Sequence, residues 1–271
     1  MFVNKKEPLI SVITVCLNSE KTIKTTIESV LHQTYKNYEY IIKDGGSSDS
    51  TIEIAEKYVD AFEGKLRIIT KKDKCMYDAM NQGIDASRGD VIGIINSDDF
   101  YSENTLELVA DAYSRSDNPY YIVIGDMERV TKDGKPICRY HFTPSMVSKK
   151  ECFGHPSMFA AKAVYEKIGL YDITYKLAAD GDWQYRAMED DNVLVEVYPE
   201  VFNHMREGGA SDMLKNRWRW FRERSRMQIQ HKKGNKISIY SKEIIKVLAT
   251  DVKNFLPRNL QTLAYKVKYK Q

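Results

Sequence analysis

Two kinds of hydrophobic pattern alternate along the first 125 residues of the chain. Short apolar runs typical of buried strands are separated by segments in which apolar residues recur at three- and four-residue spacing, as in amphipathic helices. The runs predict strands at residues 9–17, 38–43, 66–70, 91–95 and 120–125. The spaced segments predict helices at residues 20–32, 51–58, 76–86 and 104–115. This alternation predicts an α/β fold with a mainly parallel sheet that carries helices on both faces.

The pattern is less regular after residue 125. It predicts strands at 137–143 and 193–198, and helices at 162–168 and 180–188. Two more amphipathic segments follow, within 214–236 and at 241–255. We therefore expect a globular domain over residues 1–212, with a first half at about 8–125 and a second half at about 126–212. A helical extension over 213–271 is expected to follow it.

The charges are distributed unevenly between these two parts. The net charge is only +3, but residues 1–214 carry 25 Lys and Arg against 35 Asp and Glu, whereas residues 215–271 carry 16 against 3. An acidic domain with a basic extension indicates that the extension binds an anionic lipid surface, a nucleic acid or an acidic partner. Nucleic acid is the poorest of these candidates, because the domain is acidic and the chain has no recognisable nucleic-acid-binding motif.

The basic extension also has an aromatic face. Leu214, Trp218 and Phe221 fall on one side of a helix whose other positions are rich in arginine. Basic amphipathic helices with Trp and Phe are typical of peripheral membrane contacts, which we expect over 214–236. The alternative is that this face packs on the domain itself or on a second subunit, in a homodimer.

Several protein classes are disfavoured by composition. The longest apolar run, residues 9–17, is shorter than the roughly 20 residues that a membrane-spanning helix needs. The first six residues lack the apolar core of a secretory signal. The four cysteines are far apart in the sequence, so neither a zinc site nor a disulfide framework is expected. The expected compartment is a reducing cytoplasm.

The most informative polar motif is Asn96-Ser97-Asp98-Asp99, which directly follows the apolar run at 91–95. Carboxylates at the end of a buried strand need solvent, hydrogen-bond donors or a cation. Clusters of oxygen ligands suit Mg²⁺ or Mn²⁺, which typically bind one or two carboxylates together with substrate phosphates. The alternative is that the two aspartates start a turn or cap the helix that follows.

Polar residues end two other predicted strands, where Asn18 follows the first and Asp44 ends the second. In open α/β sheets, ligands bind beyond the carboxyl ends of the parallel strands. We therefore expect Asn18, Asp44, Asp98 and Asp99 to face one site.

With these motifs in place, residues 8–212 resemble the family 2 glycosyltransferases of GT-A fold. The blocks that carry the resemblance are 11–15 with Asn18, 44–51, 76–84 through Gly89, and 96–99. It implies a Rossmann-like sheet with a donor half at 8–125 and an acceptor half at 126–212. It also implies a hexosyltransferase that moves a sugar from a nucleotide-diphosphate donor, usually a UDP-sugar, to a hydroxyl with inversion. Many relatives extend lipid-linked sugars at the inner face of the cytoplasmic membrane, so a glycan or a polyprenyl-diphosphate-linked acceptor is expected there.

The resemblance assigns donor and metal roles to residues of the first half. A divalent ion, Mn²⁺ or Mg²⁺, would offset the charge on the leaving diphosphate at Asp98 and Asp99. The family often has Asp where this chain has Asn96, so the metal prediction rests on these two residues, and which of them binds the metal rather than the ribose stays open. His204 is a further candidate metal ligand, or a contact of the diphosphate.

The remaining donor-side candidates come from the same blocks. Asp44 is expected at the nucleotide base, with an Asx turn as the alternative. Thr14 and Asn18 are expected along the nucleotide, although Asn18 is equally a residue that ends its strand. Asp78 and Asn81 share one helix face and are donor contacts or part of a solvated surface.

The acceptor side of the site comes from the second half. Inversion in one displacement needs a general base, and Asp180 matches the family's acidic motif, although Ala179 stands where that motif has Glu. Asp182 is the second candidate, and the alternative for the pair is that one of the two acids caps the helix N-terminus. Trp183 is expected at an acceptor sugar or in the core, and His155 near the acceptor or in a structural hydrogen bond. Arg206, with Gly208-Gly209, is expected in a lid over the phosphates.

Two other functions fit a fold of this type. A nucleotidyltransferase would need a Gly-rich basic loop after the first strand, where this chain has Cys16-Leu17-Asn18-Ser19-Glu20. A non-catalytic nucleotide-sugar-binding relative would not need Asp44, Asp98, Asp99 and Asp180 together.

Overall fold

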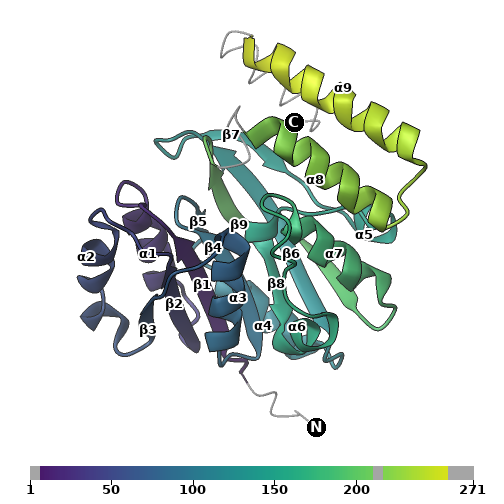
Figure 1. Ribbon diagram of the computed structural model, residues 1–271. Helices are drawn as coiled ribbons and strands as arrows, with labels where there is room; N and C mark the ends of the chain where they lie inside the picture. The colour runs from purple at the N-terminus through teal and green to yellow at the C-terminus, as the bar shows by residue number, and fades with distance from the viewer. Residues whose placement is uncertain (1–6, 210–215, 256–271) are drawn as a thin grey trace.

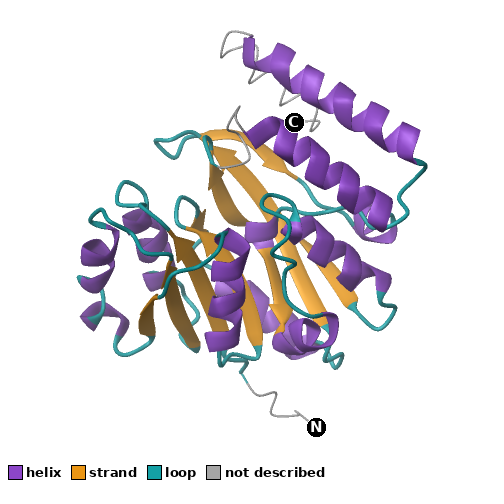
Figure 2. Ribbon diagram, in the orientation of Figure 1, coloured by secondary structure: helices purple, strands orange, loops and turns teal. Residues whose placement is uncertain are grey.

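A single curved sheet organises the molecule (Figures 1 and 2). The computed structural model describes residues 7–209 and 216–255. Within them the strand order is β3-β2-β1-β4-β8-β6-β9-β5, with β7 paired to β6.

The first half of the sheet is parallel, as the alternating pattern predicts. Its strands are β1 (Ile10–Cys16), β2 (Tyr38–Asp44), β3 (Leu66–Thr70) and β4 (Val91–Asn96). Its helices are α1 (Ile23–Leu31), α2 (Thr51–Glu56), α3 (Met76–Ala86) and α4 (Thr105–Arg115), and a single 3-10 turn, η1 (Asp60–Phe62), follows α2.

The rest of the sheet and the helices around it include elements that the pattern did not predict. The predicted strands appear as β6 (Tyr121–Val130), β7 (Pro136–Tyr140) and β9 (Leu194–Arg206), and the predicted helices as α6 (Lys162–Ile168) and α7 (Ala179–Glu189). The additional elements are β5 (Phe100–Tyr101), α5 (Pro144–Ser148), η2 (His155–Ser157) and β8 (Met158–Ala161). Strand β9 extends well beyond the predicted 193–198, because it pairs with β6 along its length and with β5 near its end.

Strand β8 joins the two halves of the sheet. It runs antiparallel to both β4 and β6, which places it between them. Gly93 in β4 makes this possible, because a Cβ at this position would lie 2.2 Å from Cε1 of Phe159. The missing side chain therefore lets the Phe159 ring pack closely against β4.

Helices cover both faces of the sheet, as expected from side-chain alternation along the strands. In β1, Ile10 and Val12 face one core, which α1, α2 and α4 complete. Ile13 and Val15 face the other core, which contains residues of α3, α6 and α7. The predicted α/β architecture is thus confirmed.

The extension forms two helices, α8 (Arg217–Gln230) and α9 (Lys236–Phe255). Phe221 and Met227 of α8 are buried, and Met227 belongs to the same apolar core as Trp183 of α7. The predicted boundary at residue 212 and Leu214 of the predicted aromatic face lie outside the described residues. Among the described helices, none combines the length and apolar character needed to cross a membrane.

Candidate active site

The loops that follow β1, β2 and β4 lie side by side at one edge of the sheet. Cys16 of β1 is in register with Asp44 of β2, and Val15 is in register with Asn96 of β4. Beyond the strands, the Ser19 and Ser97 hydroxyl oxygens are 2.7 Å apart. The structure therefore brings together the strand ends at which the sequence predicts the donor site.

Asp44 forms a tight turn with its own loop. Its carboxylate is buried and accepts hydrogen bonds from the N–H groups of Gly46 at 2.8 Å and Ser47 at 2.9 Å, and from the Ser47 hydroxyl at 2.5 Å. Gly46 has φ = 103°, which an L-residue rarely adopts. The Asx-turn alternative is thus present in the structure. A carboxylate has about four lone-pair positions, so the predicted contact with a nucleotide base is compatible with this turn.

Asn18 and Thr14 occupy different environments. Asn18 is exposed, has φ = 53°, and its Oδ1 accepts the Ser48 N–H at 2.9 Å, which joins the loops after β1 and β2. Thr14 is fully buried, and its hydroxyl oxygen accepts a hydrogen bond from the Tyr40 hydroxyl at 2.9 Å. Of these two donor candidates, only Asn18 reaches the surface at the strand ends.

A buried lysine supports the same edge and was not predicted from the sequence. The Lys43 side chain has no exposed surface, and its Nζ donates to the Asp44 carbonyl at 2.6 Å and to the Lys71 carbonyl. Nζ also lies 3.5 Å from Oδ2 of Asp73. Lys43 therefore ties the end of β2 to the loop that precedes α3.

Asp98 and Asp99 differ sharply in burial. Asp99 is 1% exposed, and its carboxylate accepts hydrogen bonds from the Arg206 N–H at 3.1 Å and from Asn96 Nδ2 at 3.2 Å. Asp98 is only partly buried and lies next to Gly209, whose added Cβ would be 3.5 Å from Asp98 Oδ2. Burial and the neighbouring Asp98 charge raise the pKa of Asp99 well above its usual range. Asp98 is therefore the carboxylate that faces outward, and Asp99 the one that holds β9.

His204 is engaged by protein groups at both ring nitrogens. Nδ1 lies 3.0 Å from Glu128 Oε2 and Nε2 lies 3.1 Å from the Ser102 hydroxyl oxygen, while the ring stacks on Phe100 with centroids 4.7 Å apart. Burial lowers the pKa of His204, and the Glu128 carboxylate opposes that shift. Both ring nitrogens of His204 therefore have protein partners.

Arg206, in contrast, lies at the aspartate pair. Its guanidinium donates to the Asp98 carbonyl at 2.9 Å and packs over the Phe100 ring at 5.1 Å. With its main chain held by Asp99, Arg206 provides a positive charge beside the predicted phosphate site. Gly208, two residues later, has φ = 98°, so the chain turns sharply there.

The two donor candidates on α3 make local contacts. The Asp78 carboxylate accepts the Lys74 N–H at 2.8 Å and a hydrogen bond from Gln82 at 3.2 Å, and it is partly exposed. Asn81 is 9% exposed, and its amide bonds both the N–H and the carbonyl of Tyr171, each at 3.0 Å. Asn81 therefore fastens the segment before α7 to α3, and Asp78 remains the donor candidate of the pair.

Asp180 faces the first half of the molecule. The Tyr77 hydroxyl of α3 donates a hydrogen bond to Asp180 Oδ1 at 2.8 Å. Nearby, His155 Nε2 lies 2.8 Å from the Tyr171 hydroxyl, and the Tyr77 and Tyr171 rings are 5.8 Å apart. Burial lowers the pKa of His155 and the Asp180 charge opposes this. The structure thus groups Asp180 and His155, as the sequence predicts, and adds Tyr77 and Tyr171.

Asp182 and Trp183 turn toward the interior. Trp183 has no exposed surface, donates from Nε1 to the Gly169 carbonyl at 2.8 Å, and stacks on Tyr165 with centroids 4.5 Å apart. Asp182 is 2% exposed and pairs with Arg186 at 2.9 Å. These contacts support the core alternative for Trp183 and a structural role for Asp182, and they leave Asp180 as the accessible acid.

The described residues contain no group of three or more His, Cys, Asp or Glu side chains that is arranged to hold a metal ion. The aspartate pair still fits a hard cation, since Mg²⁺ is commonly bound by one or two carboxylates and completed by substrate phosphates. Burial and the neighbouring Asp98 charge both disfavour the charged form of Asp99 and so raise its pKa, and a bound cation would offset this cost.

The family model for glycosyl transferase family 2 matches residues 11–168, which is more than half of the chain. The chain belongs to glycosyl transferase family 2. This match includes the strand-end motifs, α3 and β8 but ends before α7.

Relatives named as glycosyltransferases or polysaccharide synthases support the assignment. A PGL/p-HBAD biosynthesis glycosyltransferase of Mycobacterium tuberculosis is 26% identical over 209 residues, which cover 76% of this chain and 80% of the relative. Chondroitin synthase of Escherichia coli is 31% identical over 164 residues, covering 59% of this chain and 24% of that protein. The chain is thus a glycosyltransferase.

Solved structures confirm its fold. TarS residues 1–349 of Staphylococcus aureus in complex with UDP superpose with a TM-score of 0.66 at 16% identity, covering 93% of this chain and 76% of that one. The complex with UDP-GlcNAc gives a TM-score of 0.65 at 17% identity, covering 87% and 71%. The predicted GT-A fold is confirmed.

Two residues that contact the candidate site residues, Tyr77 and Lys43, were not predicted from the sequence. Tyr77 lies inside the block 76–84, but its partner Asp180 is 103 positions away. Lys43 looks like a polar strand end, and nothing in its neighbourhood predicts its complete burial. The sequence shows only that Tyr77 and Lys43 are polar residues beside a motif. This does not identify the residues that they contact.

Proposed function

We propose that this glycosyltransferase moves a sugar from a nucleotide diphosphate to an acceptor hydroxyl with inversion, and that Asp180 is the general base. The observation that carries the proposal is the hydrogen bond between Tyr77 of the donor half and Asp180 of the acceptor half. It supports a location for Asp180 at the junction of the two halves, where donor and acceptor would meet.

The chemistry follows from this location. The free Asp180 oxygen takes the proton of the acceptor hydroxyl as that oxygen attacks the anomeric carbon. The new bond joins the acceptor oxygen to the anomeric carbon, and the bond from that carbon to the diphosphate oxygen breaks. Because Tyr77 occupies Oδ1, Oδ2 is left for the proton.

We assign the outward-facing Asp98 as the protein ligand of Mn²⁺ or Mg²⁺, and Asp99 as the residue that supports it. The ion would supply Lewis-acid stabilisation of the leaving diphosphate. Arg206 beside Asp98 adds positive charge in the same place. His204 is not included, because Glu128 and Ser102 hold both of its nitrogens.

A UDP-sugar is the proposed donor. The solved neighbours with the same fold include complexes with UDP and with UDP-GlcNAc, which supports a uridine nucleotide. For the acceptor, the names of the relatives refer to PGL/p-HBAD biosynthesis and to chondroitin synthesis. They support a glycan or a lipid-linked acceptor and a place in polysaccharide or glycolipid assembly.

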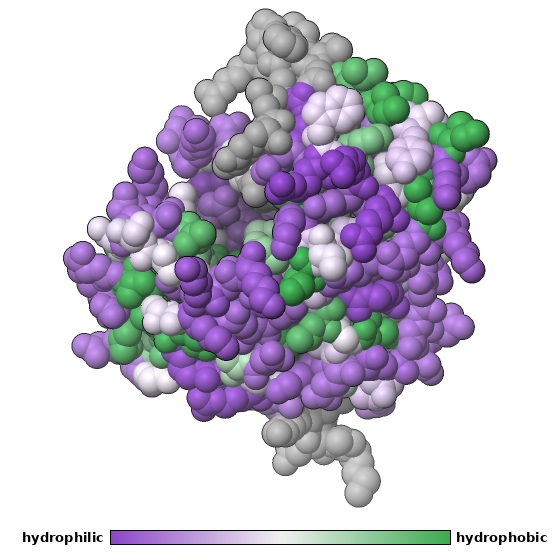
Figure 3. Space-filling view, in the orientation of Figure 1, coloured by the Kyte–Doolittle hydropathy of each residue, from purple (hydrophilic) through white to green (hydrophobic). Residues whose placement is uncertain are grey.

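We further propose a peripheral contact of the extension with the inner face of the plasma membrane, in a cytoplasmic enzyme. In α8 the predicted aromatic face is divided, because Phe221 is buried while Trp218 is 64% exposed. Within the described part of the extension, exposed apolar side chains lie mainly on α9, at Ile237, Tyr240, Ile244, Ile245 and Leu248. They form a hydrophobic area over α9 (Figure 3) beside the basic residues of the extension. A homodimer through the same area is the competing outcome.

The decisive experiment compares wild type with Asp180→Asn, with Mn²⁺ present and a panel of UDP-sugars as donors. We expect transfer to fall by about 10²–10⁴-fold, since a general base contributes that much. UDP binding measured by calorimetry should be retained. Normal turnover by Asp180→Asn would contradict the role of the base, and pyrophosphate release from a nucleoside triphosphate would favour a nucleotidyltransferase.

A further inference from the structure

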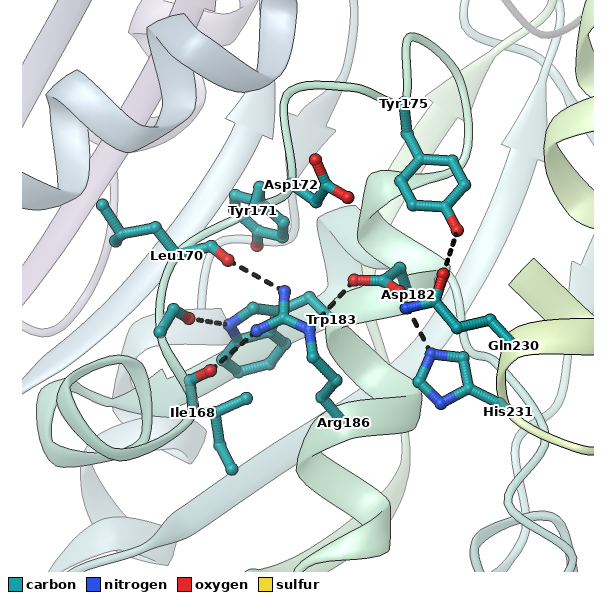
Figure 4. A network of polar contacts seen from close by, with 12 residues as sticks. Ile168, Leu170, Tyr171, Asp172, Tyr175, Asp182, Trp183, Arg186, Gln230 and His231 are labelled. Atoms are coloured by element: carbon teal, nitrogen blue, oxygen red, sulfur yellow. Dashed lines mark hydrogen bonds and ion pairs between the residues drawn. The ribbon is translucent and has the colours of Figure 1, made fainter. Parts of the chain in front are cut away.

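The side of helix α7 that carries Asp182 contacts α8 through a cluster of ionisable side chains, in which Asp182 and His231 are buried (Figure 4). Asp182 Oδ1 lies 3.0 Å from Nε2 of His231, the residue at the end of α8, and Asp182 Oδ2 accepts from Arg186 Nε at 2.9 Å. His231 Nδ1 lies 3.1 Å from Glu189 Oε2. The His231 and Asp182 side chains are only 5% and 2% exposed. The extension therefore reaches into the acceptor half and does not merely lie on its surface.

Helix α8 also holds the segment that leads into α7. One carboxylate oxygen of Glu223 accepts the N–H groups of both Lys176 and Leu177, at 2.9 and 2.7 Å. The Tyr175 hydroxyl donates to Gln230 at 3.1 Å (Figure 4). Main-chain groups just before Asp180 are thus paired with side chains of the extension.

A third contact lies next to Asp180 itself. Gly181 packs so closely against Met227 of α8 that an added Cβ would lie 2.9 Å from the Met227 sulfur. Met227 is 2% exposed. The first turn of α7 is therefore fitted to the surface of α8.

These contacts fix the direction in which Asp180 points. Residues two positions apart on a helix do not share a face, so the side chain of Asp182 faces α8 while that of Asp180 faces Tyr77 of α3. Any rotation or shift of α7 away from α8 would move Asp180 relative to the donor half. In enzymes, a displacement of about 1 Å can cost about 10²-fold in rate.

We propose that α8 is a positioning element for Asp180, acting through His231 at the Asp182 side of α7 and Glu223 at the preceding segment. The C-terminal extension is then part of the acceptor site, in addition to any contact it makes with a membrane. This inference rests on the proposed role of Asp180 as the base.

The test uses the full chain and the substitution His231→Leu. This removes the polar contacts with Asp182 and Glu189 and leaves an apolar side chain in place of the imidazole. We expect faster amide hydrogen exchange over residues 175–186 and unchanged exchange in β1 and β2. UDP affinity should stay within about twofold, while UDP release from a UDP-sugar that the wild type turns over with Mn²⁺ falls at least tenfold. His231→Gln, which restores a hydrogen-bond donor, should recover part of this loss.

Two further variants make the comparison specific. Arg222→Ala alters an exposed residue of the same helix and should match the wild type in every measurement. Glu223→Gln keeps the shape of the side chain and should reproduce the His231→Leu effects in weaker form, which preserves the test if His231→Leu does not fold.

The outcomes separate this inference from the proposed function. Wild-type turnover by His231→Leu, or parallel losses of UDP affinity and turnover, would overturn the positioning role. Full activity of Asp180→Asn would overturn the base assignment instead. In that case the exchange data for His231→Leu still decide whether α8 holds the segment before α7.

Discussion

The Tyr77 hydroxyl donates a 2.8 Å hydrogen bond to Asp180 across the junction of the two halves of the sheet. Tyr77 is 2% exposed, and burial together with the Asp180 charge raises its pKa well above the usual range. The phenol therefore stays protonated and remains a donor at neutral pH. It fixes one oxygen of the proposed base and leaves the other available.

Tyr77→Phe should lower kcat for transfer by about 10- to 100-fold, because a hydrogen bond to a charged group is worth about 1.5–3 kcal/mol. The ring is retained, so the Kd for UDP and the Tm should change little. Steady-state kinetics beside calorimetry with UDP would measure both. Tyr121→Phe is the matched control, since the buried Tyr121 donates to the Glu196 carboxylate far from the site. Equal losses of kcat in the two variants would contradict a specific role for Tyr77.

The different burial of Asp98 and Asp99 predicts different consequences of their removal. Asp98→Ala should reduce metal-dependent turnover at least about 100-fold, with a Tm close to that of the wild type. Asp99→Ala leaves the Arg206 N–H and the Asn96 amide without their acceptor, which should lower the free energy of unfolding by about 1–3 kcal/mol. Thermal unfolding and Mn²⁺-dependent UDP release would separate the two. A larger loss of stability in Asp98→Ala than in Asp99→Ala would reverse this assignment.

The lowered pKa of His155 predicts that the free energy of unfolding decreases at mildly acidic pH. Burial lowers its pKa below the unfolded value of about 6.5, so the unfolded state binds the proton first as the pH falls. The free energy of unfolding should therefore decline as the pH is lowered from about 7.5 through 6.5, until the pKa of the folded state is reached. Denaturant titrations at several pH values would show a shallower decline for His155→Gln. His32→Gln, at an exposed position, should keep the wild-type slope.

The apolar side chains of α9 predict lipid binding that depends on both hydrophobic contact and charge. The wild type should float with vesicles that contain phosphatidylglycerol, and less so at high salt. Ile244→Glu combined with Leu248→Glu should weaken this binding at least about tenfold, since both residues are exposed and lie one helical turn apart. Leu194→Glu, at another exposed leucine, is the control. Absence of flotation together with a dimer by light scattering would favour the packing alternative.

The alternating pattern was sufficient to predict the first half of the sheet, because each parallel strand there is a short apolar run that is followed by an amphipathic helix. The helix at 76–86 and the strand at 66–70 have the predicted bounds. The pattern failed at β8, whose four residues depend on pairing with β4 and β6 on either side. Such a strand is created by tertiary contacts and has little signal of its own.

The sequence indicates which strand ends carry the candidate site, but it does not distinguish the roles of the individual residues. Asn18, Asp44 and the aspartate pair follow strand ends at one edge of the sheet, because the carboxyl ends of neighbouring parallel strands meet, and their shared role in a donor site stays a prediction. The sequence could not separate Asp98 from Asp99, since they are adjacent and identical. The structure separates them by burial and by the Arg206 N–H, which Asp99 accepts. Likewise, only the structure reveals that Asn81 bonds the Tyr171 main chain and that Thr14 is inside the sheet.

The position of β8 limits where the chain can be truncated to give a stable fragment. Because β8 covers the free side of β4, a fragment that ends near residue 125 would expose the main-chain N–H and C=O groups of β4 along an unprotected edge. Unpaired edges of this kind recruit strands from other chains and lead to aggregation. We expect the portion proposed to bind the nucleotide to need residues up to at least 161 before it is recovered as a monomer. Minimal versions for screening donors should therefore retain β8.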